Sequence, residues 1–278
     1  MEVVANAGLV TRDIKPNIGS QVLNSKEDLL SGRHSVEIRD LMERRGVVVF
    51  PGLYFTDEEQ VAFTRTLGET ARERTGEEVF TISLDPEKSS GVEYLKGAFY
   101  WHFDGVIQAK PILASLLCAK VLPPWGGDTE FCNTYAAYDG LSDAEKEQLS
   151  GLRVVHSNWA PLLYHTPEPS HAQLEAFAGF GEIELPLVWT HRSGRKSLVL
   201  GCTATQVIGM GRKESALLLN RLREWATSEL FHYSHKWSLG DMVMWDNTGT
   251  LHRATPYPVD SGREMHRTKL EGEEPIAA

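Results

Sequence analysis

Short apolar runs separated by turn-forming residues make up most of the chain from about residue 99 onward. The runs are rich in branched and aromatic side chains, which is typical of β-strands. In order, they read LASLLCAKVL, TEFCNTY, LRVVHSN, IELPLVW, KSLVLGC, DMVMWDN and MHRTKL. Many short strands with few helices between them predict a sandwich or barrel of the jelly-roll type. We therefore expect a mostly β protein with flanking helices, in the α+β class.

Amphipathic segments predict the helices that flank the strands. Residues 36–46 combine spaced apolar side chains with basic residues and a terminal glycine, and they lead into the β-branched run VVVF. Capping boxes, in which Ser or Thr is followed three residues later by Glu, start two more helices at Thr56 and Ser142. A further helix is expected over residues 212–227, with one apolar stripe formed by Leu217, Leu218, Leu222 and Trp225.

The chain of 278 residues is expected to fold as a single domain, residues 1–278. Its hydrophobic content of 41% and charged content of 24% are those of an ordinary globular protein. A polar stretch with proline and glycine interrupts it around residues 69–98, and short strands are expected there in VFTISL and VEYL. Long insertions in a compact domain are often functional, so this stretch is predicted to be a loop or lid.

Charge and cysteine content argue against several classes of protein. Lys and Arg number 28 against 38 Asp and Glu, and the net charge of −10 gives no electrostatic footprint for nucleic acid. Three scattered cysteines without a CxxC motif indicate neither a zinc cluster nor a disulfide framework. The start of the chain lacks a signal-peptide pattern, and no apolar stretch is long enough to cross a membrane. The predicted location is therefore the cytosol.

Two separated motifs carry side chains that can bind a metal ion. His102 and Asp104 are two residues apart, so in a strand both point to the same face. His252 follows a turn-rich stretch far downstream, and two facing sheets of a jelly roll could bring it to the same place. Two histidines and one carboxylate leave three coordination positions open, which is the arrangement of non-haem Fe(II) oxygenases. By itself the H-x-D spacing is common and carries little weight.

Four ordered blocks resemble the Fe(II)- and 2-oxoglutarate-dependent taurine dioxygenase family, which includes the 2,4-dichlorophenoxyacetate dioxygenases. The blocks are WHFD (101–104), PPWGGDTEF (123–131), THRSGRKSL (190–198), and WDNTGTLHRATPY with REMHRT (245–257 and 263–268). The early VVVFPG and the opening MEVVAN fit as well, so the similarity covers nearly the whole chain. The resemblance implies a double-stranded β-helix core of the jelly-roll, cupin-like type. It also implies Fe(II) as the metal, with 2-oxoglutarate and O2 as co-substrates.

Carried over residue by residue, the resemblance implies His102, Asp104 and His252 as the iron ligands. It implies that Thr129 helps to hold 2-oxoglutarate and that Arg263 pairs with the distal carboxylate of this co-substrate. The second role is physically reasonable, because guanidinium groups match carboxylates in a bidentate way.

The same resemblance places Trp245 near the metal and co-substrate, and it places Arg267 at the acidic group of the substrate. If REMHR is a strand, Arg263 and Arg267 share one face and His266 points away. A buried guanidinium without an anionic partner is unfavourable. With the distal carboxylate of the co-substrate taken by Arg263, we expect the partner of Arg267 to be a carboxylate or sulfonate of the substrate.

Candidate substrate contacts lie in two loops. Taurine dioxygenase has a histidine in the loop after the second helix that helps to bind sulfonate. This chain has no histidine there, but Arg72 or Arg74 could supply the positive charge instead. The remaining candidates are expected to line the substrate pocket. They are Phe80, Trp159, Tyr164 and His165.

The expected function is hydroxylation or oxidative cleavage of a small anionic substrate, with release of succinate and CO2. The alternative is a cupin-like metal-binding protein or metal hydrolase that uses the same ligands without redox chemistry. A clamp for a dianion beside the metal favours the dioxygenase. The expected partners are a small molecule and further copies of the chain in a homo-oligomer, with neither nucleic acid nor membrane.

Overall fold

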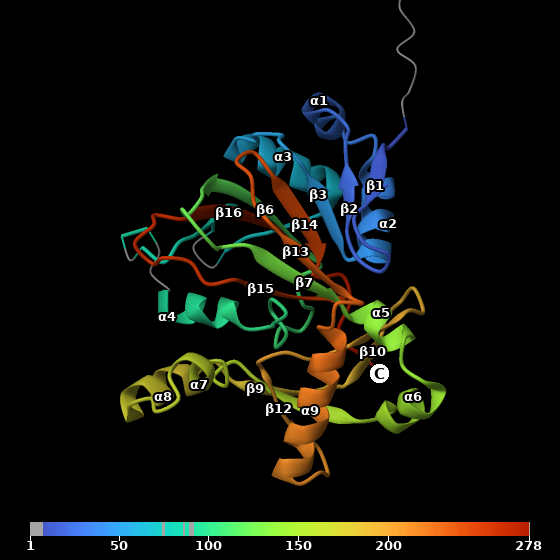
Figure 1. The fold of residues 1–278 in the computed structure, drawn as a ribbon, viewed down its shortest axis with the longest axis vertical. Helices are drawn as coiled ribbons and strands as arrows, with labels where there is room; N and C mark the ends of the chain where they lie inside the picture. Colours follow the sequence, from blue (N-terminus) through green and yellow to red (C-terminus); the bar gives the residue numbers. More distant parts are fainter. Residues whose placement is uncertain (1–7, 74–75, 86, 89–91, 278) are drawn as a thin grey trace, which may run out of the picture.

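The computed structural model describes residues 8–73, 76–85, 87–88 and 92–277. A large mixed sheet in the upper half of the molecule combines strands from the start, middle and end of the chain (Figure 1). Its strands are β1 (Thr11–Asp13), β2 (Ser20–Val22), β3 (Val47–Phe50), β4 (Thr70–Ala71), β5 (Phe80–Ile82), β6 (Ala114–Val121), β14 (Met242–Asp246) and β16 (Glu264–Leu270). They follow the order β1-β2-β3-β14-β6-β16-β4, and β5 also pairs with β16. Neighbours run antiparallel except β2 and β3.

A second sheet of three strands packs against the large one. It consists of β7 (Thr129–Asn133), β13 (His232–His235) and β15 (Thr250–Ala254), with β7 in the centre. An apolar layer fills the space between the sheets, and Val243 of the large sheet meets Phe131 of the small one there. The strand pairings in the described residues leave the two sheets separate, so the closed double-stranded β-helix expected from the resemblance is not seen. The expected combination of sheets and flanking helices is present.

The central strands of the large sheet are continuously apolar because both faces of the sheet are buried. In β3, Val48 and Phe50 pack into the cluster beneath the helices, whereas Val47 and Val49 pack into the layer between the sheets. This alternation is the two-residue period of a strand. The covering helices are α1 (Lys26–Leu30), α2 (Ser35–Arg45) and α3 (Asp57–Leu67).

The lower half of the molecule in Figure 1 contains two small sheets and most of the remaining helices. The sheets are formed by β8 (Arg153–Ser157), β9 (Glu182–Pro186) and β12 (Ala204–Val207), and by β10 (Val188–Thr190) with β11 (Lys196–Leu198). The helices are α5 (Thr134–Asp139), α6 (Asp143–Leu149), α7 (Leu162–His165), α8 (His171–Ala178) and α9 (Arg212–Ala226). Between the halves lie α4 (Val92–Leu95) and the 3₁₀ helix η1 (Lys96–Phe99). Within the described ranges, none of the helices combines the length and apolar composition that crossing a bilayer requires.

All four expected helices are present, and two other expectations need correction. The capping boxes at Thr56 and Ser142 start α3 and α6 as predicted. The segment VEYL (92–95) is helix α4 and not a strand, because a short mixed run does not by its period distinguish the two structures. In α9 the buried stripe runs through Leu219 and Leu222. The prediction that Leu217 belongs to this stripe is wrong, because its residue is 63% exposed.

Leu→Ala at a buried and at an exposed position of α9 measures how much the lower core contributes to the free energy of unfolding. Leu222 is fully buried in the core and Leu217 lies on the solvent side of the same helix. Leu222→Ala should lower the free energy of unfolding by about 2–5 kcal/mol, because it removes buried methyl groups and leaves a cavity. Leu217→Ala should change it by less than about 0.5 kcal/mol. Urea denaturation of both variants measures the difference, and equal losses would place the core on the wrong face of α9.

Candidate metal centre

One antiparallel bridge brings the two predicted motifs together. The amide of His102 donates to the carbonyl oxygen of His252, and the amide of His252 donates to the carbonyl oxygen of His102, each over 3.1 Å. His252 belongs to β15, whereas His102 lies between η1 and β6 and forms only this isolated bridge. His102 and Asp104 therefore do not lie in a regular strand, although both side chains still face the same point.

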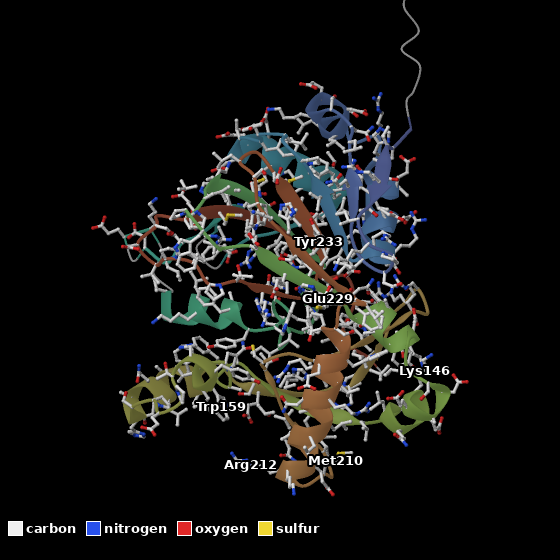
Figure 2. The ribbon with its side chains drawn as sticks, in the orientation of Figure 1. Lys146, Trp159, Met210, Arg212, Glu229 and Tyr233 are labelled. Carbon is white, nitrogen blue, oxygen red and sulfur yellow. The ribbon has the colours of Figure 1, made fainter. Side chains whose placement is uncertain are left out.

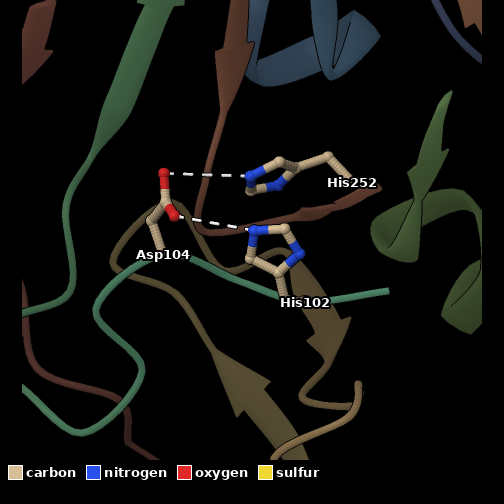
Figure 3. Close-up of side chains that lie close together, drawn as sticks. All are labelled: His102, Asp104 and His252. Carbon is tan, nitrogen blue, oxygen red and sulfur yellow. Dashed lines mark ion pairs between the residues drawn. The ribbon is translucent and has the colours of Figure 1, made fainter. Parts of the chain in front are cut away.

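Three side chains converge at this bridge (Figure 3). Nε2 of His102 lies 3.8 Å from Oδ1 of Asp104, and Nε2 of His252 lies 3.8 Å from Oδ2 of the same carboxylate. These separations are too long for hydrogen bonds. One ligand atom from each residue lies within 4.8 Å of the other two, so a single ion between them could bind all three.

The histidines present the correct atoms to a metal. Nδ1 of His102 donates to the carbonyl oxygen of Tyr100 over 2.8 Å, so in the neutral ring the lone pair is on Nε2. Burial lowers the pKa of His252 to about 3 and keeps this ring neutral. Metal binding requires neutral histidine. Two neutral imidazoles and one carboxylate are the donor set that suits Fe(II) in non-haem oxygenases, so the residues present fit this metal.

Asp104 is held in place from two sides. Asn247 accepts from the amide of Asp104 over 2.9 Å and donates to its carbonyl oxygen over 2.7 Å. The carboxylate accepts from Ser115 over 3.2 Å and from Arg267 over 3.0 Å. Although burial raises the pKa of the Asp104 carboxyl, the charge of Arg267 is the largest opposing effect, and the pKa lies well below its usual range. The carboxylate is therefore ionised and oriented before any metal binds.

The three side chains open into a cavity of about 480 Å³. Other residues that the sequence predicted for the site line the same cavity; they are Thr129, Trp245, Arg263, Arg267, Phe80 and His165. Trp245 packs its ring 4.8 Å from the ring of His252, which agrees with the expected aromatic near the metal. His266 is bonded to Asp57 and Glu264 instead and does not line the cavity, as expected from its opposite face.

Arg263 is a buried cation without a carboxylate partner. Its residue is 4% exposed, Nη2 donates to the carbonyl oxygen of Gly127 over 3.0 Å, and the guanidinium lies 4.7 Å above the ring of Tyr257. Its Nε has no hydrogen-bond partner among the described residues. No carboxylate in that part of the chain is within ion-pair distance, although the charge of Asp128 acts on the guanidinium from further away. Burial of such a group is unfavourable unless an anion pairs with it. Arg263 thus marks an anion site beside the three candidate ligands.

Arg267 differs from the expectation, because it has anionic partners within the chain. Its Nη1 lies 3.0 Å from Oδ2 of Asp104, and its Nη2 lies 3.8 Å from Oε1 of Glu73. The argument that only a substrate could neutralise Arg267 is therefore wrong. The sequence did not reveal these pairs, since Glu73, Asp104 and Arg267 are far apart along the chain.

The structure does not bring every predicted substrate contact to the cavity. Arg72 has a side chain that is 61% exposed, and it donates to the carbonyl oxygen of Gly76. Trp159 lies in the lower half of the molecule and donates to Glu182 over 2.7 Å (Figure 2). Tyr164 is exposed and borders a separate hollow next to α9. Neither Arg72, Trp159 nor Tyr164 lines the cavity, and Arg74 lies outside the described residues.

Several cavity residues were not predicted. Glu73 and Lys269 bring further charges, and Phe177 and Phe180 bring aromatic rings from α8 and the turn after it. For Lys269 a signal existed, because it follows Arg267 by two residues on the same strand and must share its face.

Comparisons with known proteins agree with this geometry. The sequence model of the family described as "Taurine catabolism dioxygenase TauD, TfdA family" matches residues 11–269, a range that includes all three candidate ligands. An alpha-ketoglutarate-dependent 2,4-dichlorophenoxyacetate dioxygenase from Cupriavidus pinatubonensis is 35% identical over 294 residues, covering 96% of this chain and 97% of that protein. An (S)-phenoxypropionate/alpha-ketoglutarate-dioxygenase from Sphingobium herbicidovorans is 32% identical over 240 residues, covering 82% of each.

A solved structure matches over the same length. The crystal structure of AAD-2 in complex with Mn(II) and N-oxalylglycine superimposes with a TM-score of 0.81 at 32% sequence identity. The match covers 97% of this chain and 100% of that one.

The candidate metal centre predicts that each histidine is needed for metal affinity but not for the fold. His102→Ala and His252→Ala should each weaken Fe(II) binding, measured anaerobically, by more than about 100-fold, since outer partners of metal ligands alone change affinity about 10- to 100-fold. His171→Ala, at a histidine exposed on α8, is the matched control and should bind like the unmodified protein. Unchanged affinity in His252→Ala would contradict the assignment.

Proposed function

This chain belongs to the TauD, TfdA family of dioxygenases, and we propose that it hydroxylates or oxidatively cleaves a small anionic substrate. Like its named relatives it is an oxidoreductase that depends on 2-oxoglutarate (alpha-ketoglutarate), and it uses Fe(II) and O2. The observation that carries the proposal is the unpaired, buried Arg263 in the same cavity as His102, Asp104 and His252.

In the proposed mechanism His102, Asp104 and His252 would hold Fe(II), the metal that this donor set suits. When bound, iron with 2-oxoglutarate and O2 supplies the oxidising chemistry, in which one oxygen atom ends in succinate as CO2 leaves and the other reaches the substrate. Asn247 fixes the backbone of Asp104, and Tyr100 fixes the ring of His102. These contacts orient the ligands before the co-substrate arrives, which reduces the reorganisation that the reaction requires.

Arg263 and Thr129 form the proposed site for the distal carboxylate of 2-oxoglutarate. The hydroxyl oxygen of Thr129 accepts from Nε1 of Trp237 over 3.0 Å, so its own hydrogen remains free to donate. Arg263 offers the unsatisfied Nε–H. A carboxylate that accepts from both would neutralise the buried guanidinium.

The rest of the cavity suits an organic acid with an apolar body. Phe80, Phe177 and Ile107 line it together with the cationic Arg267 and Lys269. The two relatives described above are named for aryloxy acids, which combine an aromatic ring with one carboxylate. We propose a substrate of this kind, a carboxylate or sulfonate with a largely apolar remainder.

The same proposal covers the architecture of the whole protein. The two facing sheets support a double-stranded β-helix core in a single domain over residues 1–278. Its loop insertion around residues 69–98 borders the cavity through Phe80 and Leu95. We propose further that the protein works as a homo-oligomer in the cytosol. A metal hydrolase or a metal-binding protein without redox function, the alternative from the sequence, is not supported, since the matching family is one of dioxygenases.

Removing the anion site should raise the requirement for 2-oxoglutarate. Arg263→Ala loses a hydrogen-bonded charge pair worth about 1.5–3 kcal/mol, which corresponds to about 10- to 150-fold in affinity. The dissociation constant for 2-oxoglutarate of the Fe(II) protein measures this loss under anaerobic conditions. Arg195→Ala, which removes an arginine that is not part of the cavity lining and stacks on Tyr135 instead, is the control. An unchanged constant in Arg263→Ala would show that another residue binds the distal carboxylate.

The proposed function predicts succinate formation that depends on an added organic acid. A panel of aryloxyacetates, alkylsulfonates and alkyl sulfates, each compared with a neutral analogue, should show turnover for acids and little for the neutral compounds. Succinate and CO2 are measured together with the oxidised product. Failure of the Fe(II) protein to convert 2-oxoglutarate with or without these acids would contradict the proposed function.

A further inference from the structure

Lys269 and Glu73 both line the cavity, and neither has so far been given a specific partner among the bound molecules. Lys269 follows Arg267 by two residues in β16, and its side chain is only 9% exposed. Its Nζ lies 2.5 Å from Oε1 of Glu73. The same oxygen lies 3.8 Å from Nη2 of Arg267, so one carboxylate oxygen faces two cations.

The charges that line the cavity do not cancel. Arg253 is paired with Glu130 over 2.5 Å. Of the other ionised side chains that line the cavity, three are positive and two negative; they are Arg263, Arg267, Lys269, Glu73 and Asp104. Fe(II) and the dianion 2-oxoglutarate add charges that cancel each other. Among these lining side chains one positive charge therefore remains at Arg267 and Lys269, while Asp128, outside the lining, acts only on Arg263.

The position of this excess charge is given by the geometry. Arg263 lies by Gly127 and Tyr257 and is assigned to the co-substrate. Arg267 and Lys269 project from the same face of β16 toward a common oxygen atom of Glu73. Since buried charges are stable only when paired, an acid that enters the cavity gains most where it contacts both cations.

Resting on the proposed function, we propose that Lys269 is a specificity-determining residue which, with Arg267, binds the acidic group of the substrate. Glu73 is then an internal anion that occupies this position until the substrate replaces it. Glu73 comes from the short connection between β4 and β5, where its amide donates to the carbonyl oxygen of Glu77. Displacement of Glu73 requires its side chain, which is 20% exposed, to change rotamer toward solvent.

The two members of the pair consequently have opposite effects on acid binding. Lys269→Gln removes a cation from the substrate site and should weaken the binding of acids about 10- to 150-fold, the range expected for a hydrogen bond between charged groups. Glu73→Gln removes the competing anion and should strengthen acid binding several-fold. A purely structural ion pair predicts instead that both substitutions act in the same direction.

The test measures equilibrium binding without turnover. Protein loaded with Mn(II) and N-oxalylglycine is titrated calorimetrically with phenoxyacetate, 2-phenoxyethanesulfonate, hexyl sulfate and the neutral phenoxyacetamide. The series contains the unmodified protein, Lys269→Gln, Glu73→Gln and Lys88→Gln. Lys88→Gln is the matched control, because it breaks an ion pair of 2.7 Å between the same insertion and β16, at Glu264, outside the cavity lining. Thermal unfolding and the affinity for N-oxalylglycine show whether each variant keeps its fold and its co-substrate site.

The inference expects weaker acid binding in Lys269→Gln, tighter acid binding in Glu73→Gln, and unchanged binding of phenoxyacetamide and of all ligands in Lys88→Gln. The acid with the highest affinity shows whether the site prefers a carboxylate, a sulfonate or a sulfate ester. Equal acid affinity in Lys269→Gln and the unmodified protein, weaker acid affinity in Glu73→Gln, or no binding of any acid would overturn it. The proposed function is tested separately by succinate release from the Fe(II) protein, so either can fail alone.

Discussion

The antiparallel bridge between His102 and His252 is the contact on which the candidate site depends. Two backbone hydrogen bonds of 3.1 Å hold together residues from different parts of the chain and aim both imidazoles at Asp104. The surrounding sheets hold the bridge rigidly, because β15 is paired along its length with β7 and the layer between the sheets is apolar.

Strand β16 supplies the second constraint, which is electrostatic. Together with the residue that precedes it, this strand brings three cations to one cavity, at Arg263, Arg267 and Lys269. The cavity also contains the carboxylates of Asp104 and Glu73, so the site is a set of nearly balanced buried charges within apolar walls. A dianionic co-substrate, a divalent metal and an acidic substrate fit such a set, because each neutralises charges that are unfavourable when they are buried alone.

Local sequence patterns predicted local structure, and the resemblance predicted which side chains meet. The capping box at Thr56 specified the start of α3, because capping depends on residues adjacent in sequence. The exposed Leu217 and the pairing of Arg267 with Asp104 were not predictable in this way. Both depend on tertiary contacts: the first on which face of α9 meets the lower core, and the second on the distance between β16 and the H-x-D motif.

The central claim is that His102, Asp104 and His252 support a dioxygenase that couples decarboxylation of 2-oxoglutarate to substrate oxidation. The most direct measurement is the fate of labelled oxygen when the Fe(II) protein reacts with 2-oxoglutarate, an acid that it converts, and ¹⁸O2. The account predicts one labelled oxygen atom in succinate and one in the hydroxylated product. Succinate without label would contradict it, as would a stable alcohol product whose new oxygen comes only from water; an aldehyde formed by cleavage exchanges its oxygen with water and is not scored.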